Sequence, residues 1–292
     1  TKNNFMNILM NMSSRLVIAL GIAGCVITAG CDLSAGRMIG FGACISGMLL
    51  QRMDYSGKFF PDMQPLNVFV VALIAMLVCA AFGTVTGFFI AYLNVPPFIA
   101  TLAMMEIVYG IGLIVTNATP LGGYVEQYTN VSNGKFLGIN YLIWIAIIVA
   151  AITWFIFNMT RHGKYMYAIG GNPQAAEVAG VPVKATLILI YMKAAAMYGL
   201  AGFMLGAKAG GASVQTGYGY EMEAIAACTI GGVSVTGGRG KVSSAIIGVA
   251  VFELLKVALQ YLGMNANAQY IAIGVVIFIA ISLDIRKYIA RK

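Results

Sequence analysis

Residues able to do metal or acid–base chemistry are few in this sequence. The chain has one histidine, His162, which lies between Arg161 and Lys164 in a polar stretch. We expect that side chain to face solvent or lipid headgroups, and we predict neither a His-based zinc site nor a His-based catalytic triad. The cysteines show no CxxC spacing and lie in or beside apolar segments, so they are typical of small core residues. They are Cys25, Cys31, Cys44, Cys79 and Cys228.

A Gly-rich stretch at 237–241 is similar to a phosphate-binding loop. That motif needs Gly, four further residues and then Gly-Lys-Ser/Thr, because backbone amides must wrap around the phosphates. Here the first position is Val235 and the last is Val242. Both required positions differ, so we predict no nucleotide site and no cofactor on this chain.

Ionisable residues within or beside apolar stretches are the remaining candidates for chemistry. Glu253 and Lys256 are three residues apart, and on one helix they could neutralise each other. Lys193 is expected to extend its side chain towards a basic helix end. Glu106 has no assigned role. A proton relay needs more carboxylates than these, so an ion-coupled mechanism is a weaker alternative.

The composition places these few groups in a membrane protein. Charged residues make up only 10% of the 292 residues, hydrophobic residues make up 60%, and the mean hydropathy is +0.86. A soluble domain has about 25% charged residues, so this chain cannot cover a water-facing surface. The net charge of +8 comes from basic residues scattered between apolar runs, which does not favour nucleic-acid binding. The composition indicates a polytopic helical membrane protein.

Uncharged runs predict an all-α fold with about nine transmembrane or half-spanning helices. Residues 63–105 contain no charge and are long enough for two crossings, since one crossing needs about 20 residues. Segments 37–50 and 221–235 are short and Gly-rich, so we expect buried or half-spanning helices there. The predicted segments are 15–31, 37–50, 66–92, 97–116, 141–158, 185–208, 221–235, 242–262 and 267–285.

Basic residues in the connecting loops predict the orientation. With the C-terminus in the cytoplasm, the cytoplasmic side receives ten Lys and Arg residues and the opposite side six. Nine crossings then place Thr1 on the outer side, and we expect the first helix of a ten-helix chain to be absent.

The loop 160–184 carries the clearest local signals. Asn172 suits a helix N-cap, Pro173 the first helical position, and Gly180 a C-terminal stop. A helix of about two turns is unstable alone. We therefore expect a groove in a partner protein to hold it.

This loop and four further blocks resemble one family. The segment 163–183 is similar to the cytoplasmic coupling loop of permease subunits of bacterial ABC importers for monosaccharides. Four other blocks occur in that family's order: 32–37, 91–102, 219–228 and 231–240. The resemblance covers nearly all 292 residues. Within the family, galactose/methyl-galactoside permeases are most similar, and ribose permeases are next.

The resemblance implies a single permease domain, 1–292, with the ABC importer permease fold, in a bacterial inner membrane. It implies a homodimer around a central pathway, a cytoplasmic ATPase subunit that carries ATP and Mg, and a periplasmic or lipid-anchored sugar-binding protein. Such a chain is a transporter subunit and not an enzyme. Specificity is expected to reside in the binding protein, so we expect no deep sugar pocket here.

Two groups of residues follow as site candidates. The resemblance implies that the loop couples to the ATPase through Gly170, Gly171, Asn172, Pro173, Ala175, Ala176 and Gly180. Pathway or gating roles are candidates for Asp32, Ser34, Arg37, Glu221 and Glu223. Helix capping is the alternative for Glu221 and Glu223, because carboxylates stabilise a helix N-terminus.

The sequence leaves three classes of protein as candidates. An ABC permease for a galactose-type sugar is favoured, with a ribose-type permease as the nearest alternative. An ion-coupled secondary transporter is more remote. A membrane-embedded enzyme would need acids, bases or metal ligands that the sequence does not group together.

Overall fold

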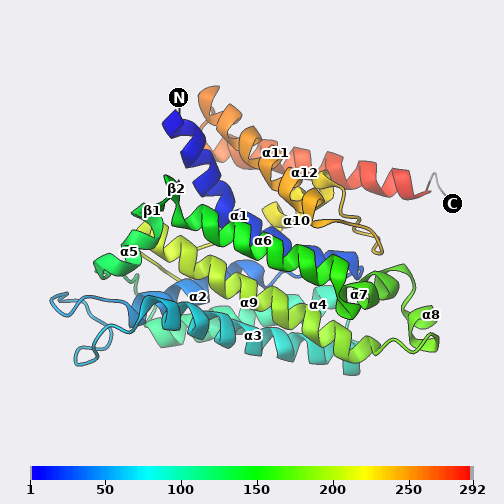
Figure 1. Cartoon of the computed structure of the whole chain (residues 1–292), viewed down its shortest axis with the longest axis horizontal. Coiled ribbons are helices and arrows are strands. Elements are labelled where there is room, and N and C mark those ends of the chain that lie inside the picture. Colours follow the sequence, from blue (N-terminus) through cyan, green and yellow to red (C-terminus); the bar gives the residue numbers. More distant parts are fainter. Residues whose placement is uncertain (1, 290–292) are drawn as a thin grey trace.

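The structure, a computed structural model, describes residues 2–289. Within this part the chain is a bundle of helices with one short β-hairpin (Figure 1). The first part comprises α1 (Lys2–Ile27), α2 (Ala35–Leu49), α3 (Val68–Tyr92), α4 (Pro97–Thr116), α5 (Glu126–Asn133), β1 (Lys135–Phe136) and β2 (Ile139–Asn140). The second comprises α6 (Tyr141–Met159), α7 (Arg161–Gly171), α8 (Pro173–Val178), α9 (Val183–Ala209), α10 (Tyr220–Gly231), α11 (Val242–Tyr261) and α12 (Ala266–Ile289).

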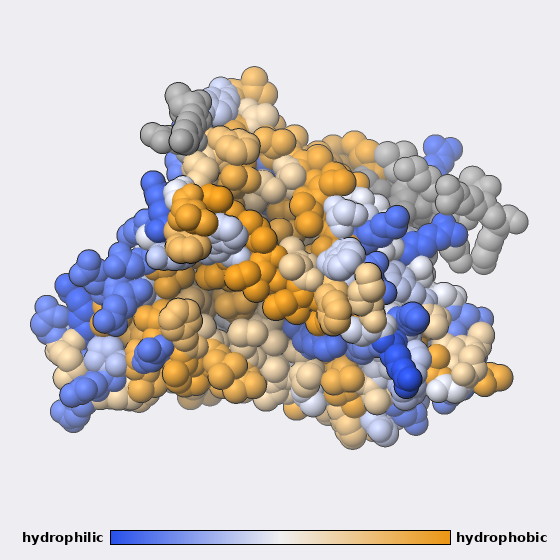
Figure 2. Space-filling view, viewed as in Figure 1, coloured by the Kyte–Doolittle hydropathy of each residue, from blue (hydrophilic) through white to orange (hydrophobic). Residues whose placement is uncertain are grey.

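The predicted all-α membrane fold is confirmed. Among the described residues, six helices are long and apolar enough to cross a membrane: α1, α3, α4, α6, α9 and α11. Figure 2 shows apolar side chains across the middle of one face and hydrophilic ones towards its two ends. We call these ends the α5 end and the α8 end, after the short helix at each (Figure 1).

The first predicted segment, 15–31, is wrong at its start. Helix α1 begins at Lys2, and so includes a polar stretch that the hydropathy pattern excluded. Ser13 and Ser14 are buried in protein, and Arg15 is paired with Glu253. Polar groups are tolerated in a membrane helix when protein partners satisfy them.

The four helices before α5 and the four after α8 share one pattern, in which a short second helix stands among three longer ones. Helices α1 to α4 have 26, 15, 25 and 20 residues, and α9 to α12 have 27, 12, 20 and 24. The two sets run in opposite directions: α1 ends at the α8 end, whereas α9 begins there (Figure 1). In each set the second helix, α2 or α10, is too short to span the bundle.

The N-termini of the two short helices meet inside the bundle. Arg15, halfway along α1, faces Glu223 in the first turn of α10. A Cβ on Gly36, in the first turn of α2, would lie 2.0 Å from the Glu221 carboxylate. The prediction of short, buried helices is therefore confirmed for α2, which is almost wholly buried. Backbone without regular structure is allowed at this depth because protein surrounds it.

Candidate functional site

The α8 end carries the predicted two-turn helix. Helix α8 begins at its N-cap Asn172, whose Oδ1 accepts a hydrogen bond from the Ala175 amide at 2.9 Å. Pro173 is the first helical residue, and Gly180 follows the helix with φ of +81°. The cap, the proline and the stop are confirmed. The preceding helix, α7, was not predicted, although its buried residues Gly163, Met166, Ile169 and Gly170 recur at helical spacing and could have indicated it.

Exposure divides the predicted coupling residues into two sets. Ala176 is 4% exposed and Gly170 is buried, so both pack against this chain itself. Val178, in contrast, is 91% exposed. Ala176 is therefore held by packing within this chain, and its role in coupling stays a prediction. The exposed predicted residues are Gly171, Asn172, Pro173, Ala175 and Gly180.

Gly170 joins α7 to two other segments. A Cβ there would lie 1.8 Å from the Ile27 carbonyl oxygen and 2.5 Å from the Gly238 amide nitrogen. The same Ile27 carbonyl accepts a hydrogen bond from the Gly238 amide at 2.8 Å. The Tyr167 hydroxyl donates to the Gly240 carbonyl at 2.8 Å. Helix α7 is thus in direct contact with the end of α1 and with the α10–α11 loop.

His162 lies at the base of α7, in a small cavity that Lys193 also lines. Burial, and secondly the charge of Lys193, lower the pKa of His162 to about 4. The imidazole is therefore neutral at physiological pH. Lys193 lies on α9, and the expected extension of its side chain towards a basic helix end stays a prediction.

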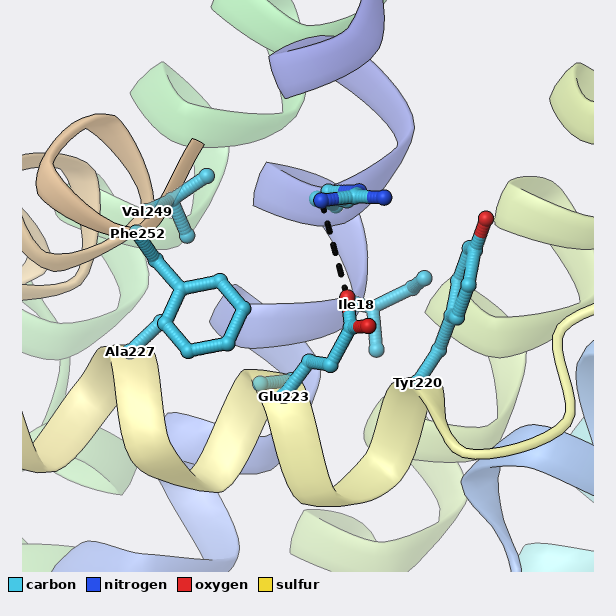
Figure 3. Close-up of a pocket in the computed structure, with 8 residues that line it drawn as sticks. Ile18, Tyr220, Glu223, Ala227, Val249 and Phe252 are labelled. Carbon is cyan, nitrogen blue, oxygen red and sulfur yellow. Dashed lines mark ion pairs between the residues drawn. The ribbon is translucent and has the colours of Figure 1, made fainter. Parts of the chain in front are cut away.

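Four charged side chains form an ion network at the centre of the bundle. Arg15 Nη1 lies 2.6 Å from Glu253 Oε2 and 3.5 Å from Glu223 Oε2. Lys256 Nζ pairs with Glu223 Oε1. Figure 3 shows Glu223 and Tyr220 projecting from α10 into a pocket, with the ion pair of Glu223 as a dashed line. The network joins α1, α10 and α11 and carries no net charge.

The expected pair between Glu253 and Lys256 is wrong. These residues occupy adjacent turns of α11, but each pairs with a different helix: Glu253 with Arg15 of α1 and Lys256 with Glu223 of α10. Arg15 is only the first residue of the predicted segment 15–31. Its polar neighbours in α1 made it look like part of an outer loop.

Arg37 forms a second polar cluster near the α10 N-terminus. Its guanidinium carbon lies 3.9 Å from the ring centre of Tyr109 and 4.5 Å from that of Tyr218. Its Nη1 also donates to Gln215 Oε1 at 2.8 Å. Arg37 lies close enough to Glu221 for a favourable electrostatic interaction. Glu221 is 5% exposed, and its Oε2 has no hydrogen-bond partner among the described residues.

The other pathway candidates, Asp32 and Ser34, form hydrogen bonds with each other. Asp32 Oδ1 accepts hydrogen bonds from the Ser34 amide at 3.0 Å and the Ser34 hydroxyl at 2.6 Å. Both residues are buried, so this pair shapes the turn before α2. Glu221 and Glu223 do lie in the first turn of α10, as the capping alternative required. Glu106 is exposed on α4, one turn before Tyr109.

A cavity of about 540 Å³ opens beside these groups. Tyr218 lines it from the α9–α10 loop, Glu221 and Glu223 line it from α10, and Lys256 lines it from α11. Tyr270 lines it from α12. The lining therefore offers carboxylates, a cation and aromatic rings. Among the described residues, no group of three or more His, Cys, Asp or Glu side chains could hold a metal ion.

Comparisons with known proteins support a transport role. A family model described as "Branched-chain amino acid transport system / permease component" matches residues 4–281. The galactose/methyl galactoside import permease protein MglC of Haemophilus influenzae is 43% identical over 296 residues, covering 99% of this chain and 88% of that protein. MglC of Escherichia coli is 42% identical with the same coverage. The ribose import permease protein RbsC of Escherichia coli is 32% identical over 291 residues, covering 98% of this chain and 87% of that protein. No solved structure matches significantly.

Proposed function

We propose that this chain, which belongs to the family of permease components just described, is the membrane-spanning subunit of an ATP-driven monosaccharide importer. The observation that carries the proposal is its 43% identity, along 99% of its length, to a galactose/methyl galactoside import permease. A galactose-type sugar is the favoured cargo. Ribose is the alternative cargo. It ranks second because the ribose permease is only 32% identical to this chain.

Exposure at the α8 end supports an ATPase partner there. A helix of six residues with most of its surface free, and with Val178 91% exposed, gains stability when a partner covers it. We assign that partner as a cytoplasmic ATPase that holds ATP and Mg. This places the α8 end and the C-terminus in the cytoplasm of a bacterial inner membrane. A sugar-binding protein docks at the α5 end, and a second copy of the chain completes the pathway.

The contacts suggest how ATPase motion reaches the sugar path. Motion of α8 moves α7, and Gly170 transmits it to Ile27 and Gly238. Gly238 lies in the loop that follows α10, whose other end carries Glu221 and Glu223. Helix α10 thus connects the coupling segment to the central polar groups. Alternating access follows if α10 takes two positions relative to α1.

Roles for the gating candidates follow from their positions. Arg37, Glu221 and Glu223 border the route that α10 controls. Asp32 and Ser34 hold the turn that fixes the start of α2. We expect only weak sugar binding by the permease without its partners, since the binding protein supplies affinity. Micromolar galactose binding in a titration of the isolated permease would contradict this.

Uptake in proteoliposomes tests the proposed function. The permease is reconstituted with a candidate ATPase and a candidate sugar-binding protein, and radiolabelled galactose and ribose are supplied separately. We expect galactose uptake that requires both internal ATP and the binding protein. Ribose uptake alone would reassign the cargo. Uptake without ATP that ionophores abolish would replace the proposal with a secondary transporter.

A further inference from the structure

Glu106 carries a carboxylate at the middle of a membrane-crossing helix. It is exposed and is the tenth of the 20 residues of α4. Its side chain forms no ion pair or hydrogen bond with any residue that the structure describes. Helix α4 packs against its own chain through a face that includes Met104 and Val108. Glu106 is two residues from each of them, so it lies on the opposite face of the helix.

A carboxylate in this position cannot face lipid without a large cost. Ionisable side chains in membrane helices face other protein or a water-filled space, because hydrocarbon does not solvate a charge. This chain itself does not cover the face that carries Glu106. One turn further along α4, a Cβ on Gly110 would have no atom within 4 Å. Water or a second copy of the chain must therefore cover this face.

A group of polar side chains linked by hydrogen bonds extends the same surface. Tyr109 lies one turn after Glu106, and its hydroxyl accepts a hydrogen bond from Gln215 Nε2 at 3.1 Å. Gln215 Oε1 accepts from Arg37 Nη1, whose guanidinium also contacts the ring of Tyr218. Gln215 is exposed, and Tyr218 is 63% exposed. We call Glu106, Tyr109, Gln215 and Tyr218 the polar wall.

We propose that the polar wall is the surface that each subunit presents to the sugar path between two copies of the chain, and that the Glu106 carboxylate accepts hydrogen bonds from the passing sugar. This inference rests on the proposed function. A carboxylate and an amide can bind sugar hydroxyls. The rings of Tyr109 and Tyr218 offer apolar faces to the C–H groups of a sugar and hydroxyls to its oxygens.

A dry contact between the two copies is the alternative cover for this face. A two-fold contact would place the surface around Glu106 against the same surface of the second copy. Its exposed neighbours on α4 are apolar: Leu102, Ala103 and Ile107. Such a contact would bury the carboxylate among apolar groups at a high cost, whereas water in a path between the copies solvates it.

Access of water to the polar wall can be measured without any sugar. Glu106→Cys is introduced into the full chain, which is inserted in both orientations in proteoliposomes, and its reaction with a charged, membrane-impermeant thiosulfonate is followed. The control is Ile148→Cys near the middle of α6, where the native isoleucine is 54% exposed. The native cysteines are buried, except for the partly buried Cys31, and the unsubstituted chain gives the background.

Labelling of Glu106→Cys well above background, with Ile148→Cys at background, is the expected result. A thiol reacts as thiolate, which forms in water and not in hydrocarbon. No labelling of Glu106→Cys would place this face of α4 against lipid or in a dry contact between copies, and would overturn the proposal. Equal labelling of the two variants would overturn it as well.

Uptake by variants then tests whether the sugar binds Glu106. Glu106→Ala is expected to slow galactose uptake about tenfold, because a hydrogen bond to a charged acceptor is lost. Glu106→Gln keeps a neutral acceptor and is expected to slow uptake about threefold. The control Ile148→Ala should leave uptake unchanged, and all three variants should keep the melting temperature of the unsubstituted chain.

Normal uptake by Glu106→Ala, or an equal loss in Ile148→Ala, overturns the contact between Glu106 and the sugar. No uptake by the unsubstituted importer overturns the proposed function instead, and the labelling result then still decides whether the polar wall faces water.

Discussion

The two oppositely directed sets of helices are packed in different ways. Helix α9 lies against α2 and α3 through glycines: a Cβ on Gly83 would be 2.4 Å from the Tyr191 carbonyl oxygen, and one on Gly202 would be 2.2 Å from that of Ile39. Its counterpart α1 meets α10 and α11 through Arg15, Glu223 and Glu253 and leaves cavities between them.

This difference assigns different tasks to the two sides. Close backbone packing gives a rigid interface where lipid offers no hydrophobic drive for association. Charged groups beside cavities can exchange partners at lower cost because water can replace a lost contact. We infer that the α3–α9 side is the scaffold. Helices α10 and α11 also pack closely, since a Cβ on Gly248 would lie 1.8 Å from the Ala227 carbonyl oxygen, so we expect these two helices to move together relative to α1.

The largest expected effect is on the scaffold side. Gly202→Ala places a methyl group against the backbone of α2 and should destabilise the protein by about 3 kcal/mol. The matched control is Gly110→Ala on α4, where no atom lies within 4 Å of the added Cβ. Thermal unfolding in detergent measures both. Equal midpoints for the two variants would contradict rigid packing of α9.

A smaller effect is expected in the ion network. Glu253→Gln leaves Arg15 without its nearest carboxylate, at a site where Glu253 is only 3% exposed. We expect the free energy of unfolding to fall by about 2 kcal/mol. This is less than the loss on breaking an ion pair that is fully shielded from water, because the adjacent cavity is open to water.

The same melting assay supplies the control for that pair. Asp54→Asn breaks the Arg52–Asp54 pair, whose side chains are 52% and 75% exposed, and should cost under about 0.5 kcal/mol. If Glu253→Gln has as high a melting temperature as Asp54→Asn, the network contributes nothing to the stability of the protein.

Substitutions on the exposed face of α8 are expected to change the rate of ATP-driven uptake and not the stability of the protein. Val178→Asp alters an exposed side chain and should lower ATP-driven uptake about tenfold while the melting temperature stays unchanged. Ala176→Leu should instead lower the melting temperature, because that position is buried. Unaltered uptake in Val178→Asp would remove α8 from the ATPase contact.

The smallest effect concerns pH. The pKa of His162 is lowered to about 4 in the folded chain from an ordinary value of 6.5, so the unfolded chain binds a proton more readily. Stability is therefore full above pH 6.5 and falls as the pH is lowered from 6.5 towards 4. Allowing for partial exposure, the loss by pH 5 is about 1 kcal/mol. His162→Asn should flatten melting temperature against pH, and an unchanged slope would contradict this assignment.

Local signals in the sequence predicted local structure well. Asn172, Pro173 and Gly180 defined α8 correctly, and short Gly-rich runs predicted the buried helix α2. These features depend on neighbouring residues alone.

Tertiary features were not predictable in this way. The start of α1 was missed because Ser13 and Ser14 become acceptable in the membrane only when other helices bury them. The partners of Glu253 and Lys256 were missed for the same reason, since Arg15 is 238 residues away from Glu253. Hydropathy windows cannot register such long-range compensation.

Hydrogen exchange in lipid nanodiscs tests the division between scaffold and moving side most directly. The complete importer is compared with and without a non-hydrolysable ATP analogue, and deuterium uptake is followed by mass spectrometry. We predict that exchange changes in α1, α10 and α11 and stays constant in α3 and α9. Equal changes on both sides, or changes confined to α3 and α9, would contradict the account.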